Sequence, residues 1–90
     1  MTASLHSPLW HEVLLAIRKS PERERYSERL NRRVQISLTR VRDLVKLLAI
    51  HDLVRFKPTK KIKYIELTEK GVRVSSLLFE MRSELGSLSD

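Results

Sequence analysis

The stretch that decides the fold spans residues 34–54 and reads V-Q-I-S-L-T-R-V-R-D-L-V-K-L-L-A-I-H-D-L-V. Ser37 is a favourable N-cap residue, because its side-chain oxygen can accept from a backbone N–H of the first helical turn. Four apolar residues then recur at spacings of three and four, as in a helix packed on a core. The pattern predicts a helix over residues 38–50, after a tight turn and before a strand. The apolar residues are Val41, Leu44, Val45 and Leu48.

The other side of this helix is polar. Thr39, Arg40, Arg42 and Lys46 stand between the core positions, and such a face can meet base edges and phosphates. Solvated surface charge is the alternative interpretation of the same side chains. Asp43 would repel phosphates, so we favour a role in holding Arg40 or Arg42 over accepting a hydrogen bond from a cytosine amino group.

A second landmark, L-T-E-K-G at residues 67–71, marks the end of a hairpin and the start of another helix. Strands are predicted over residues 54–57 and 62–67. Pro58 cannot occupy a paired interior strand position, so we place it at the tip of the hairpin. Thr68 is the expected N-cap of the last helix, which we expect to end near residue 85, before Gly86 and a polar tail.

The N-terminal part of the chain predicts a first helix. Ser7 and Pro8 suit its N-cap and first helical position. Five apolar residues between residues 9 and 17 supply one face, and the helix is expected to end at about Lys19, before Ser20 and Pro21.

A second, shorter helix is predicted after a polar link over residues 22–25, which has room for a helical turn of its own. Ser27 is its expected cap, Leu30 faces inward, and the helix ends near Arg33. The sequence shows no internal repeat or interdomain linker, so we expect one domain over residues 1–90 with short tails at 1–6 and 86–90.

These patterns together resemble the winged helix-turn-helix of small transcription regulators in the MarR-like, ArsR-like and PadR-like families and their archaeal relatives. The resemblance covers residues 8–85. Gln35 and Asp52 stand where such families usually place Gly, and both sites favour a left-handed backbone. The resemblance implies an α+β, mostly helical fold with a two-stranded wing and a C-terminal helix. It also implies a transcriptional regulator that binds double-stranded DNA, with residues 38–50 in the major groove.

Composition narrows the function classes. The 90 residues contain no Cys, which excludes disulfides, thiolate metal sites and cysteine nucleophiles. No apolar run approaches membrane-spanning length, and the N-terminus lacks a basic segment followed by an apolar one. We therefore expect a cytoplasmic protein.

The net charge of +7 is unevenly distributed. Residues 18–63 carry 15 Lys and Arg against five Asp and Glu, a net of +10, whereas the remainder is −3. The positive charge thus coincides with the predicted helix-turn-helix and wing, where a polyanionic partner explains it. The candidate DNA-contacting residues are Arg29, Arg32, Arg33, Ser37, Leu38, Thr39, Arg40, Arg42, Lys46, Lys57, Lys60, Lys61 and Lys63.

The sequence offers no catalytic or metal-binding pattern. His6, His11 and His51 are not arranged as ligands of one ion, and no carboxylate pair completes such a set. Only two Gly are present, neither in a phosphate-cradling loop, and Ser75 and Ser76 have no partnered base. We expect neither an enzyme nor a cofactor or metal site.

The last helix carries an apolar stripe that suits a twofold homodimer, because a domain this small often needs further burial. Packing against the first helix is the alternative. A protein-interaction module within a transcription or replication assembly is the alternative to DNA binding, and RNA binding lacks a signature of aromatic-rich strands. The candidate dimer residues are Trp10, Val74, Leu77, Leu78, Met81 and Leu85.

Overall fold

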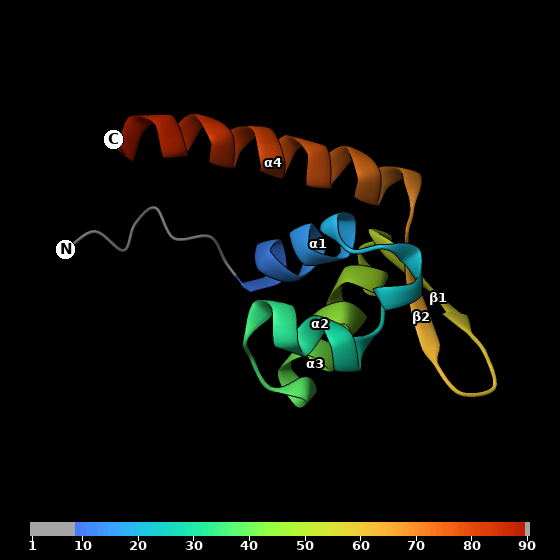
Figure 1. Cartoon of the computed structure of the whole chain (residues 1–90). Coiled ribbons are helices and arrows are strands. Elements are labelled where there is room, and N and C mark those ends of the chain that lie inside the picture. Colours follow the sequence, from blue (N-terminus) through green and yellow to red (C-terminus); the bar gives the residue numbers. More distant parts are fainter. Residues whose placement is uncertain (1–8, 90) are drawn as a thin grey trace.

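The computed structural model describes the backbone of residues 9–89 and the side chains of residues 9–85. Helices α1, α2 and α3 gather into one bundle, a hairpin projects from one side, and α4 runs across the top (Figure 1). The predicted α+β, mostly helical architecture with a two-stranded wing is confirmed. The elements in order are α1 (Leu9–Lys19), the 3-10 turn η2 (Glu22–Glu24), α2 (Ser27–Val34), α3 (Leu38–Ile50), β1 (Val54–Pro58), β2 (Lys63–Leu67) and α4 (Glu69–Ser89).

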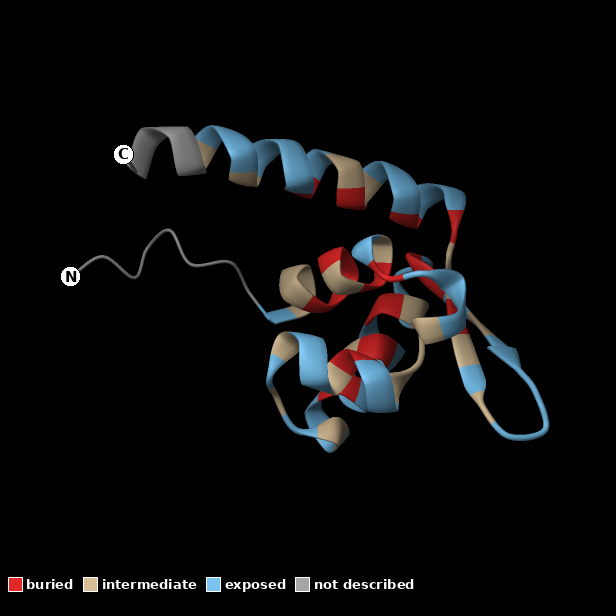
Figure 2. Cartoon of the chain, in the orientation of Figure 1, coloured by how far each residue is buried: buried red, intermediate tan, exposed pale blue. Residues whose placement is uncertain are grey.

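The core lies between the three bundled helices, the inner face of the hairpin and one side of α4 (Figure 2). Val41, Val45 and Leu48 of α3 are buried, as the spacing predicts, and Leu44 is half-buried beside them. Each fully buried aliphatic side chain contributes about 1.5–3 kcal/mol relative to an exposed one. This anchorage fixes the rotation of α3 and leaves its polar face outside. The other core residues are Val13, Leu14, Leu15, Ile17, Leu30, Leu53, Val54, Ile65 and Leu78.

Two non-glycine residues adopt left-handed backbone at the ends of helices. Gln35 (φ 63°) closes α2, where its N–H donates to the carbonyl of Asn31 at 2.9 Å. Asp52 (φ 61°) closes α3 in a Schellman motif, in which the Leu53 N–H donates to the carbonyl of Leu48 at 2.9 Å. Both are the positions where the resemblance expects Gly, so the chain keeps these turns at a cost of about 1–2 kcal/mol per residue.

The hairpin is antiparallel, with a register from Val54 opposite Leu67 to Pro58 opposite Lys63. The prediction that Pro58 forms the tip is wrong. It is the last residue of β1, where an edge strand tolerates a missing N–H, and the tip begins at Thr59, whose N–H donates to the carbonyl of Ile62 at 2.7 Å.

The junction between hairpin and α4 is built on Thr68. Its hydroxyl accepts from the Gly71 N–H at 2.9 Å, which confirms the predicted N-cap, and donates to the carbonyl of Asp52 at 2.6 Å. A Cβ on Gly71 would lie 1.9 Å from the carbonyl oxygen of Leu53. Position 71 therefore requires glycine, because the backbone of Leu53 lies too close to leave room for a side chain.

Two predicted helix ends are corrected. The cap of α2 is Tyr26, whose extended backbone carbonyl accepts from Leu30, so Ser27 is the first helical residue. Helix α4 continues through Gly86 to Ser89, because an interior Gly costs a helix only about 1 kcal/mol relative to Ala and no Pro follows. The predicted cap at residues 7 and 8 and the tail at 1–6 lie outside the described residues.

None of the helices within the described part of the chain combines the length and the apolar character needed to cross a membrane.

Candidate nucleic-acid interface

Helix α3 presents its polar face to solvent. Ser37 starts the helix, and its hydroxyl accepts from the Arg40 N–H at 3.1 Å, which confirms the predicted cap. The predicted contact residues Thr39, Arg40, Arg42 and Lys46 are all exposed, whereas Leu38 is half-buried at the flank of the helix. The exposed face therefore offers a row of donors on a rigid helix.

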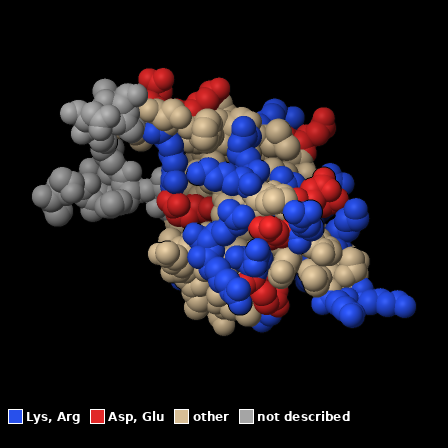
Figure 3. Space-filling model, viewed as in Figure 1, with Lys and Arg blue, Asp and Glu red and all other residues tan. Residues whose placement is uncertain are grey.

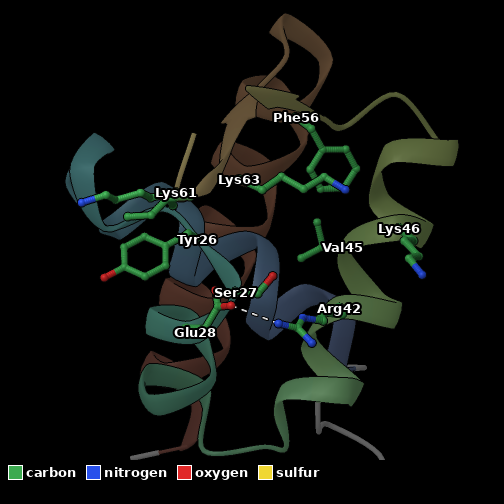
Figure 4. Close-up of a pocket in the computed structure, with 10 residues that line it drawn as sticks. Tyr26, Ser27, Glu28, Arg42, Val45, Lys46, Phe56, Lys61 and Lys63 are labelled. Carbon is green, nitrogen blue, oxygen red and sulfur yellow. Dashed lines mark hydrogen bonds and ion pairs between the residues drawn. The ribbon is translucent and has the colours of Figure 1, made fainter. Parts of the chain in front are cut away.

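A groove of about 450 Å³ separates α3 from the wing, with the start of α2 at one end (Figure 4). Four cationic side chains and one carboxylate line it, so the groove is positively charged. Two aromatic rings give it apolar walls. The lining residues are Tyr26, Ser27, Glu28, Arg42, Val45, Lys46, Phe56, Lys61, Ile62 and Lys63.

The wing directs one of its lysines toward this groove. The Lys63 ammonium lies 4.1 Å from the centre of the Phe56 ring, within the range of a cation–π interaction. Side chains alternate along a strand, so Phe56 and Pro58 lie on the same face of the hairpin. Lys63 pairs with Pro58 across the hairpin and therefore shares that face with Phe56. The aromatic ring thus positions this charge opposite α3.

Arg42 is held by an acidic residue of another helix. Its Nη2 lies 3.0 Å from Glu28 Oε2, and about half of each side chain is exposed, 52% and 57% respectively. The expectation that Asp43 holds Arg40 or Arg42 is wrong, because within residues 9–85 it forms no ion pair with either. Glu28 at the start of α2 binds the Arg42 guanidinium instead (Figure 4).

The arginines of α2 differ in their partners. Arg33 donates to Glu24 Oε1 of η2 at 2.9 Å, and Arg29 lies 3.5 Å from the same oxygen. The hydrogen bond from Arg33, with a smaller contribution from Arg29, lowers the pKa of the Glu24 carboxyl. Arg32 is exposed and has no side-chain partner among residues 9–85. Two of the three arginines predicted to clamp DNA therefore share one carboxylate.

The lysines of the wing do not all lie on one face. Lys57 pairs with Glu66 at 3.7 Å and lines a second groove of about 540 Å³ on the side of the hairpin toward η2. Lys61 and Lys63 line the groove beside α3, and Lys60 is exposed near the tip. Strand alternation explains why Lys57 and Lys63 lie on opposite faces of the hairpin. Figure 3 shows Lys and Arg over much of one face, interspersed with Asp and Glu, and basic side chains extending from the wing.

The candidate dimer residues also divide. Leu78 is 8% exposed and belongs to the domain's own core, and Val74 is half-buried beside it. Leu77 is 64% exposed and Met81 is 42% exposed. The sequence analysis did not select Phe79, which is 48% exposed. Trp10 and Leu85 are half-buried.

Arg18 belongs to the contact between α1 and α4 rather than to the basic face. Its guanidinium donates to the Ser76 hydroxyl at 2.8 Å and lies 5.6 Å from the centre of the Phe79 ring. An ion pair between Glu12 and Arg82 adds a second link between the same helices. Arg18 is counted in the positive charge of residues 18–63, but its side chain therefore stabilises the packing of α1 against α4.

His11 sits at the edge of this helix pair. Its ring contacts Trp10 edge-on at 4.0 Å between centroids, and its Nδ1 is buried without a hydrogen-bond partner. Burial lowers the pKa of His11, the charge of Arg82 lowers it further, and Glu12 opposes the shift. No three His, Asp or Glu side chains in the described part of the chain are placed to hold a metal ion.

Three residues of the groove escaped the sequence analysis. Glu28 and Arg42 are 14 residues apart on two helices, so only the angle between those helices brings them together. Tyr26 packs edge-on against Tyr64 at 5.9 Å between centroids, which fixes one wall. Phe56 could have been found from the sequence, because the alternation of side chains along the predicted strands places it on the same face of the hairpin as Lys63.

Comparison with known proteins shows similarity in structure alone. No protein-family model matches the sequence, and no curated protein sequence matches it. S. aureus MepR, solved in a complex with DNA, has a TM-score of 0.80 to this chain at 14% identity, over 92% of this chain and 61% of MepR. S. aureus MarR, solved with salicylate and kanamycin, has a TM-score of 0.78 at 18% identity, over 93% of this chain and 57% of MarR.

AF1382 from Archaeoglobus fulgidus is similar over nearly its whole length. The TM-score is 0.71 at 18% identity, over 96% of this chain and 93% of AF1382. The chain therefore spans about three fifths of MepR and MarR and almost all of AF1382. The fold of this chain is the winged helix-turn-helix found in transcription regulators of the MarR family.

Proposed function

We propose that this protein binds double-stranded DNA and regulates transcription, with α3 in the major groove and the wing along the phosphate backbone. The observation that carries the proposal is the groove between α3 and the wing, which is lined by Arg42, Lys46, Lys61 and Lys63. A DNA strand that passes between a helix and a wing would bring its phosphates to these four cations. The similarity to MepR, which was solved with DNA, supports this assignment.

The dimensions of α3 suit a duplex. Its 13 residues span about 20 Å at 1.5 Å per residue, and the major groove is about 12 Å wide, which admits one helix. Arg40 and Arg42 carry planar guanidinium groups that can pair with the O6 and N7 acceptors of guanine. Thr39 can contact a phosphate or a thymine methyl group. We assign base reading to this face.

We assign sequence-independent attraction to the wing and to the end of α2. Lys60 and Lys61 are exposed and have no ion-pair partner among residues 9–85, so they are free to follow phosphates. Lysine is a point charge on a flexible stem, which suits this role better than base identity. Arg32 can clamp the backbone where α2 crosses it.

A salt titration with random-sequence duplex tests the proposal. Affinity should fall by about 0.9 log units per log unit of salt for each phosphate that the protein neutralises. Lys60→Ala with Lys61→Ala should weaken binding to all sequences alike and reduce that slope. Lys70→Ala with Arg73→Ala removes the same charge from α4 and should change the slope much less. Absence of duplex binding at low salt would contradict DNA binding.

One observation favours a second candidate function, a protein-interaction module within a transcription or replication assembly. Ile50 is 79% exposed and Leu47 is 40% exposed at the end of α3, although both are large apolar residues. An exposed apolar patch is typical of a partner surface. The low-salt titration separates the two functions, because an interaction module has no need to bind duplex.

We also infer a homodimer through α4. Leu77, Phe79 and Met81 expose apolar surface on a helix that extends beyond the core it covers. A twofold dimer would present two copies of α3 to half-sites about 34–36 Å apart. Met81→Glu would bury an unpaired carboxylate in that contact and should separate the subunits in light scattering, whereas Arg55→Glu, an exposed change on the hairpin, should not. A monomeric parent protein, with and without duplex, would contradict the dimer.

A further inference from the structure

Glu28 is the one carboxylate among the residues that line the groove between α3 and the wing. The described chain has other acidic residues near the basic surface, but their positions differ. Glu24 is bonded to two arginines on the η2 side, and Glu66 pairs with Lys57 on the opposite side of the hairpin. An acid among four cations therefore faces the path that we propose for a DNA strand.

The contact that Glu28 makes is suited to exchange. Its pair with Arg42 is 3.0 Å long, but about half of each side chain is in solvent. Water and salt screen such exposed pairs, so a competing anion can replace the carboxylate. Glu28 also lies in the first turn of α2, where the helix dipole favours a negative charge.

We propose that Glu28 is a specificity-determining residue of the DNA interface, an inference that rests on the proposed function. A phosphate that binds Arg42 competes with the Glu28 carboxylate for the guanidinium and is repelled by it, because both are anions. A guanine edge carries no charge, so it can accept from the donors of Arg42 that Glu28 leaves unused without this repulsion. Glu28 thus penalises sequence-independent binding and holds Arg42 in position for a base.

The variant Glu28→Gln tests the proposal, since it removes the charge and keeps the shape. Its affinity for random duplex should rise several-fold, and its salt dependence should steepen by about 0.9 log units per log unit of salt, the value for one more phosphate. Affinity for a site selected by the parent protein from a random duplex library should rise less. The ratio of specific to random affinity should therefore fall.

Glu69→Gln is the matched control. Glu69 is exposed and lies in the first turn of α4, so its replacement causes the same changes in net charge and in the helix terminus away from the groove. Equal effects of the two variants would overturn the proposal. Persistence of the Glu28→Gln effect in an Arg42→Gln background would overturn it too, because the exchange must pass through Arg42.

Circular dichroism and thermal unfolding check that each variant is folded. If Glu28→Gln is unfolded, Glu28→Asp is the substitute variant, since it keeps the charge at the helix start but shortens the reach of the carboxylate toward Arg42. The ratio of specific to random affinity should again fall. An unchanged ratio overturns the proposal. The outcomes separate the two levels of inference. A parent protein that binds no duplex at low salt contradicts the proposed function, whereas a parent that binds duplex with Glu28→Gln unaltered contradicts only the role of Glu28.

Discussion

The helical side and the wing side of the basic surface carry their charge in different ways. On the helical side, Arg29, Arg33 and Arg42 are each bonded to a carboxylate of a neighbouring element. At the wing tip, Lys60 and Lys61 have no such partner within residues 9–85. The 15 Lys and Arg residues counted over residues 18–63 therefore include arginines that already have a carboxylate partner.

The difference suggests that the helical side and the wing side of this small interface have different roles. A guanidinium that is already held loses little conformational freedom when it pairs with a base, and it must exchange a partner to take a phosphate. A free ammonium has the opposite properties, because it attracts phosphates without an exchange and has little orientation to offer a base. We therefore expect changes at the pair of Arg42 and Glu28 to alter specificity and changes in the wing to alter overall affinity.

The largest effect is expected where the wing joins the helices, at Gly71. Gly71→Ala places a Cβ 1.9 Å from the Leu53 carbonyl oxygen, so the backbone of the wing's base must shift. Overpacking of this kind costs about 1–3 kcal/mol, and the better helix propensity of Ala recovers about 1 kcal/mol at most. Because the clashing atom belongs to the backbone, we take the upper end of this range, about 3 kcal/mol, and expect a net destabilisation of about 2 kcal/mol in urea unfolding.

Arg73→Ala, an exposed change on the same helix, is the control for Gly71→Ala and should stay within about 0.5 kcal/mol of the parent. An unchanged stability of Gly71→Ala would show that the wing's base adapts freely. The wing would then have no fixed position relative to α3, and the proposed difference in role between the helical side and the wing would lose its structural basis.

The next largest effect is expected at Arg42. If it reads a guanine edge, Arg42→Ala should lose about 1–3 kcal/mol on a preferred site and less on random duplex. Lys60→Ala in the wing is the comparison, since it should lose the same amount on both. Equal losses for Arg42→Ala in binding titrations on the two DNAs would reduce Arg42 to a phosphate contact and erase the contrast with the wing.

Much of the contrast between the helical side and the wing could not be predicted from the sequence, whereas the fold could. The spacing from Val41 to Leu48, the cap at Ser37 and the cap at Thr68 are local signals, and the structure confirms each of them. Local signals suffice for helix positions because capping and amphipathic burial act within a few residues. They were less reliable at Ser27 and Gly86, where small polar residues and glycine suit a helix boundary but do not require one.

The partners of the basic residues were not predictable, because they depend on how the helices cross. Arg42 meets Glu28 rather than the adjacent Asp43, since neighbours in a helix point in different directions and residues of another helix can lie closer. The side of the wing on which Lys57 lies was predictable in principle from strand parity. The placement of thirteen candidates on a DNA duplex stays a prediction that the titrations above address.

The smallest expected effect concerns Glu24, which joins the arginines of α2 to η2. The hydrogen bond from Arg33 lowers the pKa of the Glu24 carboxyl below its ordinary value of 4.5 in the folded protein. A group with a lowered folded pKa stabilises the fold above its unfolded pKa, and this contribution is lost as the pH falls through the folded value. Thermal stability should therefore decline below pH 4.5 more steeply in the parent than in Glu24→Gln. At neutral pH the same variant frees Arg29 and Arg33, so random-duplex affinity should rise slightly with no change in sequence preference. Identical pH profiles for the two proteins would show that the Glu24 pairs are too weak to distinguish the helical side from the wing.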